Sequence, residues 1–396
     1  GIADNSGKES LVTDRKMVES AGQLRQALLG KKKPITDISI WEPEVKGYIM
    51  PKWVATCTYR TSSSLMKQKL AFATGSTSSE VTVKVLAEGF ERYALEQNRS
   101  DRKGKATKLS EPFLDPRLVV PYSVDQFKFL TGIEPFDPEK EIEWVVGVRE
   151  VSGEQIWVPK QLVYYATKQT LKEGRPFYRA SSSGVAAHFD KQVAIKSALY
   201  ELIERDAFSV TWYAKRSVFS IQTGLLPSGL RSRILNWEKL GYKVSLLDLT
   251  LDGPPVVLVL IWSREKTPAL CSGASCRPLF LDAVDRAFNE AEFMAMSWHR
   301  RRIRCEMKMG DIKIPDDHGL FYIDPKNLTY VEWLLNTIAC AGERKDFEGS
   351  LDHFDPIVVD ITPSEHKCGL TVVRVLSEKL MPINFGYGDE HRVRPE

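Results

Sequence analysis

Three segments of the chain repeat one arrangement of residues that could bind phosphates and a divalent metal. In each segment a valine or alanine is followed by a polar or basic residue and then by a glutamate, at constant spacing. The copies are Val81/Lys84/Glu88, Ala194/Ser197/Glu201 and Ala283/Arg286/Glu290. Because residues three and four positions apart share one face of a helix, each copy would project its polar groups in one direction.

The first two copies extend into a longer match that adds a second carboxylate and a guanidinium. Glu88-Gly-Phe-Glu91-Arg92 corresponds to Glu201-Leu-Ile-Glu204-Arg205. Taken singly, such a segment is more often an ion-pair ladder on a solvated helix face. Two copies among apolar neighbours favour burial instead, and carboxylates held together in a buried place repel one another unless a cation lies between them. Hard oxygen ligands of this kind suit Mg²⁺ together with substrate phosphates.

The elements that must position these residues follow from hydrophobic periodicity, which indicates an α+β organisation. Helices are predicted at Val81–Leu95, Lys191–Tyr213, Leu230–Leu240, Leu281–Trp298 and Tyr330–Ala341. Strands are predicted at Trp53–Tyr59, Trp144–Val148, Gln155–Val158, Val244–Leu247, Val256–Trp262, Ile357–Ile361 and Thr371–Val375. We expect Val244–Leu247 and Val256–Trp262 to form a hairpin or adjacent strands. An Asp-x-Thr segment begins at both Asp248 and Asp360, which together with the helix copies suggests an internally repeated architecture.

Length and composition limit the organisation of the chain. With 396 residues, 43% of them hydrophobic, the chain can bury a large core. We expect residues 1–34 to form an appended N-terminal segment, flexible or in contact with a partner, with a short helix at Leu24–Leu29. Residues 35–396 are expected to form one catalytic domain, because the helices that would share a site span Glu88 to Glu290.

Composition also argues against several classes of protein. No apolar run of about 18 residues is present, so no membrane span is expected, and residues 1–30 lack the core of a signal peptide. The six cysteines are scattered, which is typical of reduced thiols in the cytoplasm. The basic runs lack the aromatic interleaving of nucleic-acid-binding modules, so no nucleic-acid partner is expected.

The order of further motifs resembles the YcaO family from about Ile38 to Arg392. The most specific part is the helix that carries Ser197, Glu201 and Glu204, preceded by Ser181-Ser-Ser-Gly184. The other landmarks are Met50-Pro-Lys-Trp53, Trp157-Val-Pro-Lys160, Asp248-Leu-Thr250, Asp360-Ile-Thr362, Gly369-Leu-Thr-Val-Val-Arg374-Val375 and Pro382-Ile-Asn-Phe-Gly386. The chain contains neither a Walker loop nor a Gly-x-Gly-x-x-Gly motif.

The resemblance implies a YcaO-type α+β fold with internally repeated helix and strand units, in which ATP is held between glutamate-bearing helices. Family members transfer the γ-phosphoryl group of ATP to a backbone amide oxygen of a ribosomally made peptide, and a nucleophile then attacks the amide carbon. A neighbouring Cys, Ser or Thr gives an azoline, sulfide gives a thioamide, and an amine gives an amidine. We expect azoline formation, with thioamide or amidine formation as the closest alternative. The alternative of another class is an ATP-binding scaffold or maturation factor.

Phosphoryl transfer needs positioning and charge neutralisation, which suggests a role for each polar residue of the motifs. The expected metal ligands are Glu88, Glu91, Glu201 and Glu204. The expected catalytic residues are Arg92, Arg205 and Glu290. Hydroxyls, cations and backbone N–H groups suit anions, and the expected nucleotide contacts are Lys84, Ser182, Ser183, Gly184, Ser197 and Arg286.

Three features depart from the family pattern. Lys84 stands where the family usually has serine, and it either reaches a phosphate or pairs with Glu88. Phe293 and Met294 follow Glu290 where a glutamine is common. The chain ends at Arg392-Val-Arg-Pro-Glu396 without the proline-rich tail of many azoline-forming members, which argues against azolines but not against amide activation.

The resemblance also implies partners. The substrate would be a ribosomally synthesised precursor peptide. No second domain for leader capture is evident, so we expect a separate partner protein, either leader-binding for azolines or sulfur-delivering for thioamides. No membrane partner is expected, and a homodimer is left open.

Overall fold

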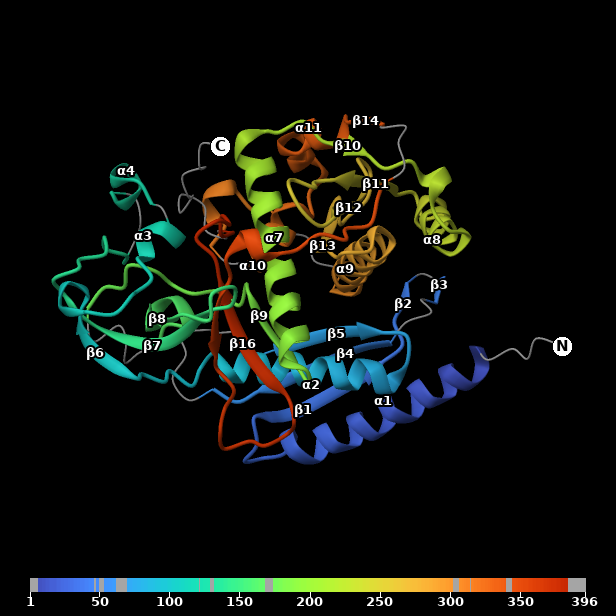
Figure 1. Ribbon diagram of the computed structural model, residues 1–396. Coiled ribbons are helices and arrows are strands. Elements are labelled where there is room, and N and C mark those ends of the chain that lie inside the picture. Colours follow the sequence, from blue (N-terminus) through green and yellow to red (C-terminus); the bar gives the residue numbers. More distant parts are fainter. Residues whose placement is uncertain are drawn as a thin grey trace. The chain divides into compact units, whose positions relative to one another are not determined.

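The computed structural model describes residues 6–45, 48–49, 53–61, 70–120, 122–128, 132–167, 174–301, 306–313, 315–339 and 344–383 (Figure 1). Helices and strands are mixed along the chain, which confirms the predicted α+β organisation. The chain divides into two compact units. Unit 1 comprises Gly1–Leu114, Asp137–Ala198 and Ile357–Val375, and unit 2 comprises Asp115–Phe136, Leu199–Pro356 and Leu376–Glu396. None of the described helices is long and apolar enough to cross a membrane.

In unit 1, helix α2 (Ser78–Ala94) lies against a sheet of order β1-β4-β5, formed by Ile35–Trp41, Trp53–Tyr59 and Leu70–Gly75. The helix begins after Thr77, whose hydroxyl accepts the Glu80 N–H at 3.1 Å. A Cβ added to Gly89 would lie 2.6 Å from the Cys57 sulfur, so glycine allows α2 to approach β4 closely. The apolar face buries Val81, Val85, Leu86 and Phe90 and leaves the glutamates on the flank.

Helix α1 (Ser6–Leu28) packs on α2, and its residues Leu24 and Leu28 are completely buried. This helix is much longer than the predicted helix at Leu24–Leu29. Two short paired strands, β2 (Glu44–Val45) and β3 (Tyr48–Ile49), follow β1.

The second sheet of unit 1 has the order β6-β7-β15-β16-β9, with β8 paired to β7. Strands β9 and β16 are antiparallel, with Val185 opposite Arg374. The sheet therefore brings the segment before helix α7 next to a segment that is distant in sequence. The strands of this sheet are β6 (Arg102–Lys105), β7 (Glu141–Arg149), β8 (Gln155–Pro159), β9 (Val185–His188), β15 (Ile357–Asp360) and β16 (Thr371–Leu376). The helices that follow β6, β8 and β9 along the chain are η1 (Ala106–Lys108), α5 (Lys160–Val163) and α7 (Lys191–Ala214).

The sheet of unit 2 has the order β13-β12-β11-β10-β14, formed by Leu270–Cys276, Val256–Trp262, Lys243–Asp248, Phe219–Ser220 and Ile338–Ala339. Every residue of β12 is buried. Helix α9 (Phe280–Arg301) packs on β12 and β13, and a Cβ added to Gly273 would lie 2.2 Å from the Ala287 carbonyl oxygen. This close approach requires glycine in β13.

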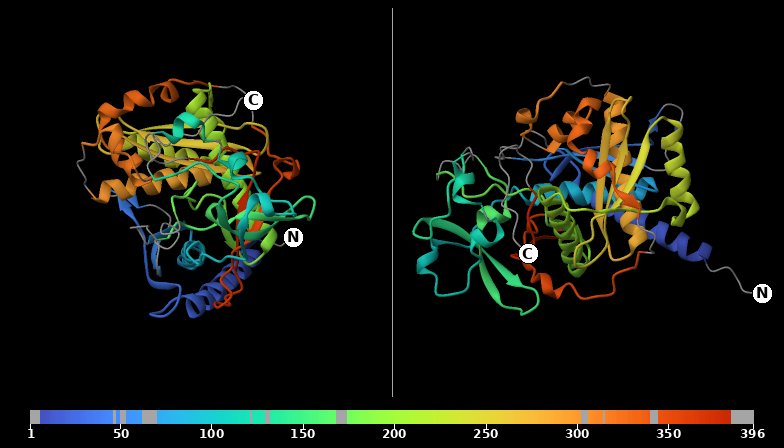
Figure 2. Two further views of the ribbon diagram at one scale, coloured as in Figure 1. Left: turned by 90° about the vertical axis from the view of Figure 1, so that its left-hand side faces the viewer. Right: turned by 90° about the horizontal axis from the view of Figure 1, so that it is seen from above.

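Helix α8 (Ser228–Lys239) packs on β11 in unit 2, as the yellow-green helix beside the yellow strands shows in the right-hand view of Figure 2, and its side chains contact α9. Arg233 of α8 joins the two helices through ion pairs with Asp285 and Glu292, both at 2.6 Å. The remaining elements of unit 2 are α3 (Pro116–Val119), α4 (Val124–Phe127), η2 (Thr223–Leu225), η3 (Met309–Asp311), α10 (Pro315–Phe321), η4 (Pro325–Tyr330), α11 (Glu332–Leu335) and η5 (Asp352–Phe354).

An Asp-x-Thr corner occurs in each unit with the same hydrogen bonds. Between β11 and β12, Asp248 accepts the Thr250 N–H at 2.9 Å, and the Thr250 hydroxyl accepts the N–H that opens β12 at 3.0 Å. Between β15 and β16, Asp360 and Thr362 make the same two contacts at 3.0 and 2.9 Å. Strands β11 and β12 are antiparallel neighbours, as predicted. These repeated corners agree with the internal repetition that the sequence suggested.

The predicted helix Tyr330–Ala341 is wrong where the segment is described. A single turn of helix, α11, ends at Asn336, whose φ is −100° and ψ is 40°. Ile338 then begins strand β14, which pairs with β10. Isoleucine is a β-branched residue type, which favours strands over helices.

Some residues of the sequence motifs lie outside the described part of the chain. They are Met50-Pro-Lys52, Asn384-Phe-Gly386 and the terminal residues 392–396.

Candidate functional site

Helix α2 carries the first acidic set within unit 1. Glu88 forms an ion pair with Arg92 one turn later, and their side chains are 30% and 24% exposed. Arg92 also donates to the Tyr165 hydroxyl at 3.3 Å. The Oε1 atom of Glu91 accepts the backbone N–H of Ala187, in β9, at 2.6 Å. This helix face is therefore half-buried and hydrogen-bonded to β9. It is not an ion-pair ladder on a fully solvated helix face.

The predicted nucleotide loop, Ser181–Gly184, immediately precedes β9. The Ser183 N–H donates to the Ser181 hydroxyl at 3.1 Å, and Gly184 has a φ of +78°. The carbonyl oxygen of Gly184 accepts the Val375 N–H at 2.7 Å. Since β9 is also bonded to Glu91, the loop and the α2 glutamates belong to one hydrogen-bonded assembly within unit 1.

In unit 2, Arg205 of α7 is surrounded by carboxylates. Its guanidinium approaches Glu201 and Glu204, each at 3.2 Å. Burial and the charges of Glu290 and Glu201 together raise the pKa of Glu204 to about 8, although the charge of Arg205 acts to lower it. Burial and the charge of Glu201 also raise the pKa of Glu290, although Glu290 accepts the Ala274 N–H at 3.0 Å. Without a bound cation, this cluster holds a proton near neutral pH.

Arg277 is a further cation of unit 2 that the sequence did not point to. Its guanidinium lies 6.0 Å from the Tyr200 ring centre and donates to the Cys276 carbonyl at 2.6 Å. Burial and the charge of Arg286 lower its pKa, while the charge of Glu204 raises it. The structure therefore brings the predicted residue Arg286 into electrostatic reach of a second guanidinium near the carboxylates. The only local signal for Arg277 is an arginine directly after a strand.

Lys84 has partners other than the one considered from the sequence. It forms an ion pair with Glu80 and donates to the Thr74 carbonyl at 3.3 Å. Its side chain is 43% exposed. The expected pairing with Glu88 is therefore replaced by pairing with Glu80, and a phosphate contact by Lys84 remains a prediction.

The carboxylates fit a metal ion that is shared with phosphates. Within the described ranges, no group of three or more His, Cys, Asp and Glu side chains is arranged to hold a metal ion. Mg²⁺ usually takes only one or two carboxylates and completes its shell with substrate phosphates and water. Glu201 and Glu204 are a pair of carboxylates of this kind, held close together by Arg205, and their chemistry suits such a partly formed site.

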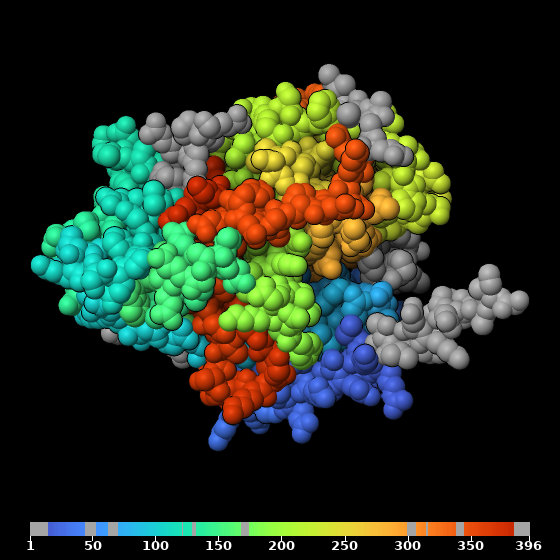
Figure 3. Space-filling view, in the orientation of Figure 1, coloured from blue at the N-terminus to red at the C-terminus, as the bar shows by residue number. Residues whose placement is uncertain are grey.

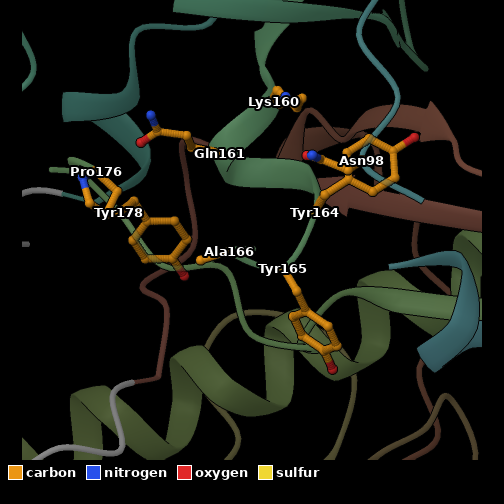
Figure 4. A pocket seen from close by; sticks show the side chains of 8 residues that line it. All are labelled: Asn98, Lys160, Gln161, Tyr164, Tyr165, Ala166, Pro176 and Tyr178. Atoms are coloured by element: carbon orange, nitrogen blue, oxygen red, sulfur yellow. The ribbon is translucent and has the colours of Figure 1, made fainter. Parts of the chain in front are cut away.

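A small pocket of unit 1 includes Tyr165, the residue that contacts Arg92 (Figure 4). It contains about 260 Å³ of empty space, including open solvent. Its lining is Asn98, Lys160, Gln161, Tyr164, Tyr165, Ala166, Pro176 and Tyr178. Lys160, from the Trp157–Lys160 motif, pairs with Glu143, and the Asn98 side-chain oxygen is buried without a hydrogen-bond partner in the described part of the chain. The lysine of this motif therefore forms an ion pair inside unit 1.

A family model described as YcaO cyclodehydratase, ATP- and Mg²⁺-binding, matches residues 72–381. The chain belongs to the YcaO family. The match includes α2, α7 and α9, and it confirms the resemblance found in the sequence motifs.

One relative is an uncharacterized protein of Methanothermobacter thermautotrophicus, 26% identical over 323 residues that cover 76% of this chain and 79% of that protein. A solved heterocyclase in complex with substrate and cofactor has a TM-score of 0.70 at 17% identity, covering 92% of this chain and 52% of that one. YcaO from Methanopyrus kandleri, bound with AMPPCP and Mg²⁺, has a TM-score of 0.62 at 18% identity, covering 93% and 89%. The chain thus spans about half of the heterocyclase, and the two TM-scores establish a shared fold.

Proposed function

We propose that this chain uses ATP and Mg²⁺ to phosphorylate a backbone amide oxygen of a ribosomally synthesised precursor peptide, and that the activated amide is cyclised to an azoline. Family membership and the fold shared with the heterocyclase support the proposal. The observation that carries it is the cluster of Glu201, Glu204 and Glu290 around Arg205, because it is a property of this chain's own residues.

The proposed chemistry solves a problem of leaving groups. An amide oxygen would otherwise leave as hydroxide, which is unfavourable. In the first step the bond between the γ-phosphorus and the bridging oxygen of ATP breaks, and a bond forms between that phosphorus and the amide oxygen. The side chain of a neighbouring Cys, Ser or Thr then adds to the amide carbon. Phosphate leaves with the former amide oxygen, and the protons of the side chain and of the amide nitrogen are released.

We assign the residues of the two acidic sets as follows. Mg²⁺, when bound, would offset phosphate charge, and its proposed ligands are Glu88, Glu91, Glu201 and Glu204. Arg92 and Arg205 orient these carboxylates and stabilise charge on the transferred group. Glu290 is proposed to act by holding the charge of Arg205 in place. The proposed nucleotide contacts are Lys84, Ser182, Ser183, Gly184, Ser197 and Arg286.

We further propose that a separate protein delivers the peptide or the nucleophile. A leader-binding partner would favour azolines, and a sulfur-delivering partner would favour thioamides. The solved heterocyclase with bound substrate and cofactor has a longer chain, of which this chain covers 52%.

The mass of the product tests this proposal. The chain, its partner and the precursor peptide are incubated with ATP and Mg²⁺, and the peptide is analysed by mass spectrometry. We expect loss of one water for each azoline, located at Cys, Ser or Thr by fragmentation. Replacement of oxygen by sulfur would assign a thioamide instead. An unchanged peptide while ATP is bound or hydrolysed would favour the scaffold alternative and contradict the proposal.

A further inference from the structure

Arg374 of β16 makes a set of contacts that the sequence motifs did not predict. The residue is 2% exposed, and its guanidinium donates to the carbonyl oxygens of Ser181, Ser183 and Val163. The distances to Val163 are 3.1 and 2.9 Å, and the distance to Ser181 is 2.7 Å. One buried cation therefore holds two alternate carbonyl groups of the serine loop.

These contacts fix the direction of the loop's N–H groups. In a planar trans peptide the C=O of one residue and the N–H of the next point in opposite directions. Because the carbonyl groups of Ser181 and Ser183 point at Arg374, the N–H groups of Ser182 and Gly184 point away from it. Ser182 is only half-buried, so its N–H is turned from the buried guanidinium toward the outer side of the loop.

The positive charge of Arg374 also prepares the N–H groups of the loop to bind an anion. A cation at the carbonyl end of a peptide group polarises that group and makes its N–H a stronger donor to an anion. The Gly184 φ of +78° allows the loop to reverse after Ser183, a conformation that other residues adopt only at a cost. Successive N–H groups in such turns commonly bind phosphate or other anions.

The same guanidinium also connects the loop to the first acidic helix. The Val163 carbonyl that it holds lies two residues before Tyr165, whose hydroxyl accepts from Arg92 and whose N–H donates to the Leu95 carbonyl at 2.9 Å. On the far side of the loop, β9 is bonded to Glu91 through Ala187. In the surface view, the orange-red segment that joins β15 to β16 lies beside the yellow-green segment that follows β9 (Figure 3), in agreement with the pairing of Thr371 with His188.

We infer that Arg374 is a positioning residue for nucleotide phosphates: it orients and polarises the Ser181–Gly184 loop so that the Ser182 N–H can donate to an anion. The inference rests on the proposed function, because that function supplies the phosphates. Arg374 acts on the loop through backbone carbonyl groups, so its effect on the ligand is indirect.

The test compares binding of ATP with binding of adenosine. Arg374→Lys keeps the positive charge but loses the planar fork that reaches several carbonyl groups at once. We expect about tenfold weaker binding of ATP in the presence of Mg²⁺, because charge-assisted contacts to phosphate are lost. Adenosine, which has no phosphate, should bind within about twofold of the wild-type affinity. Both affinities are measured by displacement of a fluorescent ATP analogue, and thermal melting checks that the variant is folded.

Two further variants make the result specific. Gly184→Ala strains the loop without changing Arg374, and we expect the same selective loss of ATP affinity. Arg216→Lys is the matched control, because Arg216 of unit 2 also holds a backbone carbonyl, that of Leu249, at 2.7 Å. This control should keep the wild-type ratio of ATP to adenosine affinity.

The outcomes separate this inference from the proposed function. If the wild-type chain binds no ATP with Mg²⁺, the proposed function fails and the inference falls with it. If the wild-type chain binds ATP and folded Arg374→Lys binds it equally well, only the inference is overturned. Equal losses for ATP and adenosine would show a purely structural role for Arg374 and would also overturn it.

Discussion

Glu88 of unit 1 and Glu201 of unit 2 hold equivalent positions in the repeat, and each pairs with an arginine one turn later. Their surroundings differ. The next glutamate of unit 1, Glu91, accepts a backbone N–H from β9. Its equivalent in unit 2, Glu204, is 7% exposed and is raised in pKa to about 8 by burial and by its acidic neighbours. The same sequence pattern thus gives two different sites. In unit 1 a carboxylate is hydrogen-bonded to the backbone, and in unit 2 burial favours the protonated form of a carboxylate.

This difference suggests separate contributions from the two sets. A proton held among crowded carboxylates is displaced when a divalent cation binds there, so the cation gains strong ligands and relieves their repulsion. We therefore expect metal-dependent chemistry to be more sensitive to loss of a carboxylate in unit 2 than in unit 1.

The largest effect is expected for Glu201→Gln. The amide keeps the size and hydrogen-bonding capacity of the side chain but removes the charge that a hard cation needs. We expect Mg²⁺-dependent phosphate release to fall by about 100-fold or more, a typical cost of losing a group that stabilises transition-state charge. Circular dichroism should show an unchanged fold.

Two matched variants test the comparison through the same assay. Glu88→Gln, in the half-exposed pair of unit 1, should reduce phosphate release less than Glu201→Gln does. Glu238→Gln, on an exposed position of α8, should leave the rate unchanged. A larger loss for Glu88→Gln than for Glu201→Gln would reverse the ranking of the two units.

A smaller effect is expected in the stability of the protein without divalent ions. Because the pKa of Glu204 is raised from 4.5 to about 8 on folding, the folded protein retains a proton that the unfolded chain has lost. This group therefore lowers the free energy of unfolding as the pH rises from about 4.5 to about 8. Glu204→Gln removes this dependence, so the stability of the variant relative to the wild type should rise between pH 4 and pH 9 by up to about 5 kcal/mol.

Urea unfolding of the wild type and Glu204→Gln over that pH range measures this difference. Changes of stability with pH that arise from other groups are common to both proteins and cancel in the comparison. Glu238→Gln serves as the control at an exposed position. Parallel curves for wild type and Glu204→Gln would show that Glu204 is not protonated in the folded state.

The helices and apolar strands could be predicted because their periodicity is strong. Strands β4 and β12 match the predicted ranges, and α2, α7, α8 and α9 differ from them by only a few residues. Strand β13 (Leu270–Cys276) was missed because its serine, glycine and alanine residues carry little β preference of their own. It becomes a strand by pairing with the fully buried β12, and a tertiary effect of this kind leaves no local signal.

The candidate site was predictable only where its contacts are local. The pairs Glu88–Arg92 and Glu201–Arg205 follow from helical spacing. The contacts of Arg374 join residues 193 and 211 positions apart, so no spacing rule could find them. The pKa of Glu204 likewise depends on Glu290, which is on another helix, so its protonation could not be derived from the repeat alone.

The fate of the amide oxygen tests backbone activation most directly. A precursor peptide is labelled with ¹⁸O at the carbonyl that becomes modified and is incubated with the chain, its partner, ATP and Mg²⁺. Released phosphate is then analysed by mass spectrometry. We predict one ¹⁸O atom in phosphate for each modified residue, because the phosphorylated oxygen leaves with the phosphoryl group. Consumption of ATP with all of the label still in the peptide would contradict amide activation.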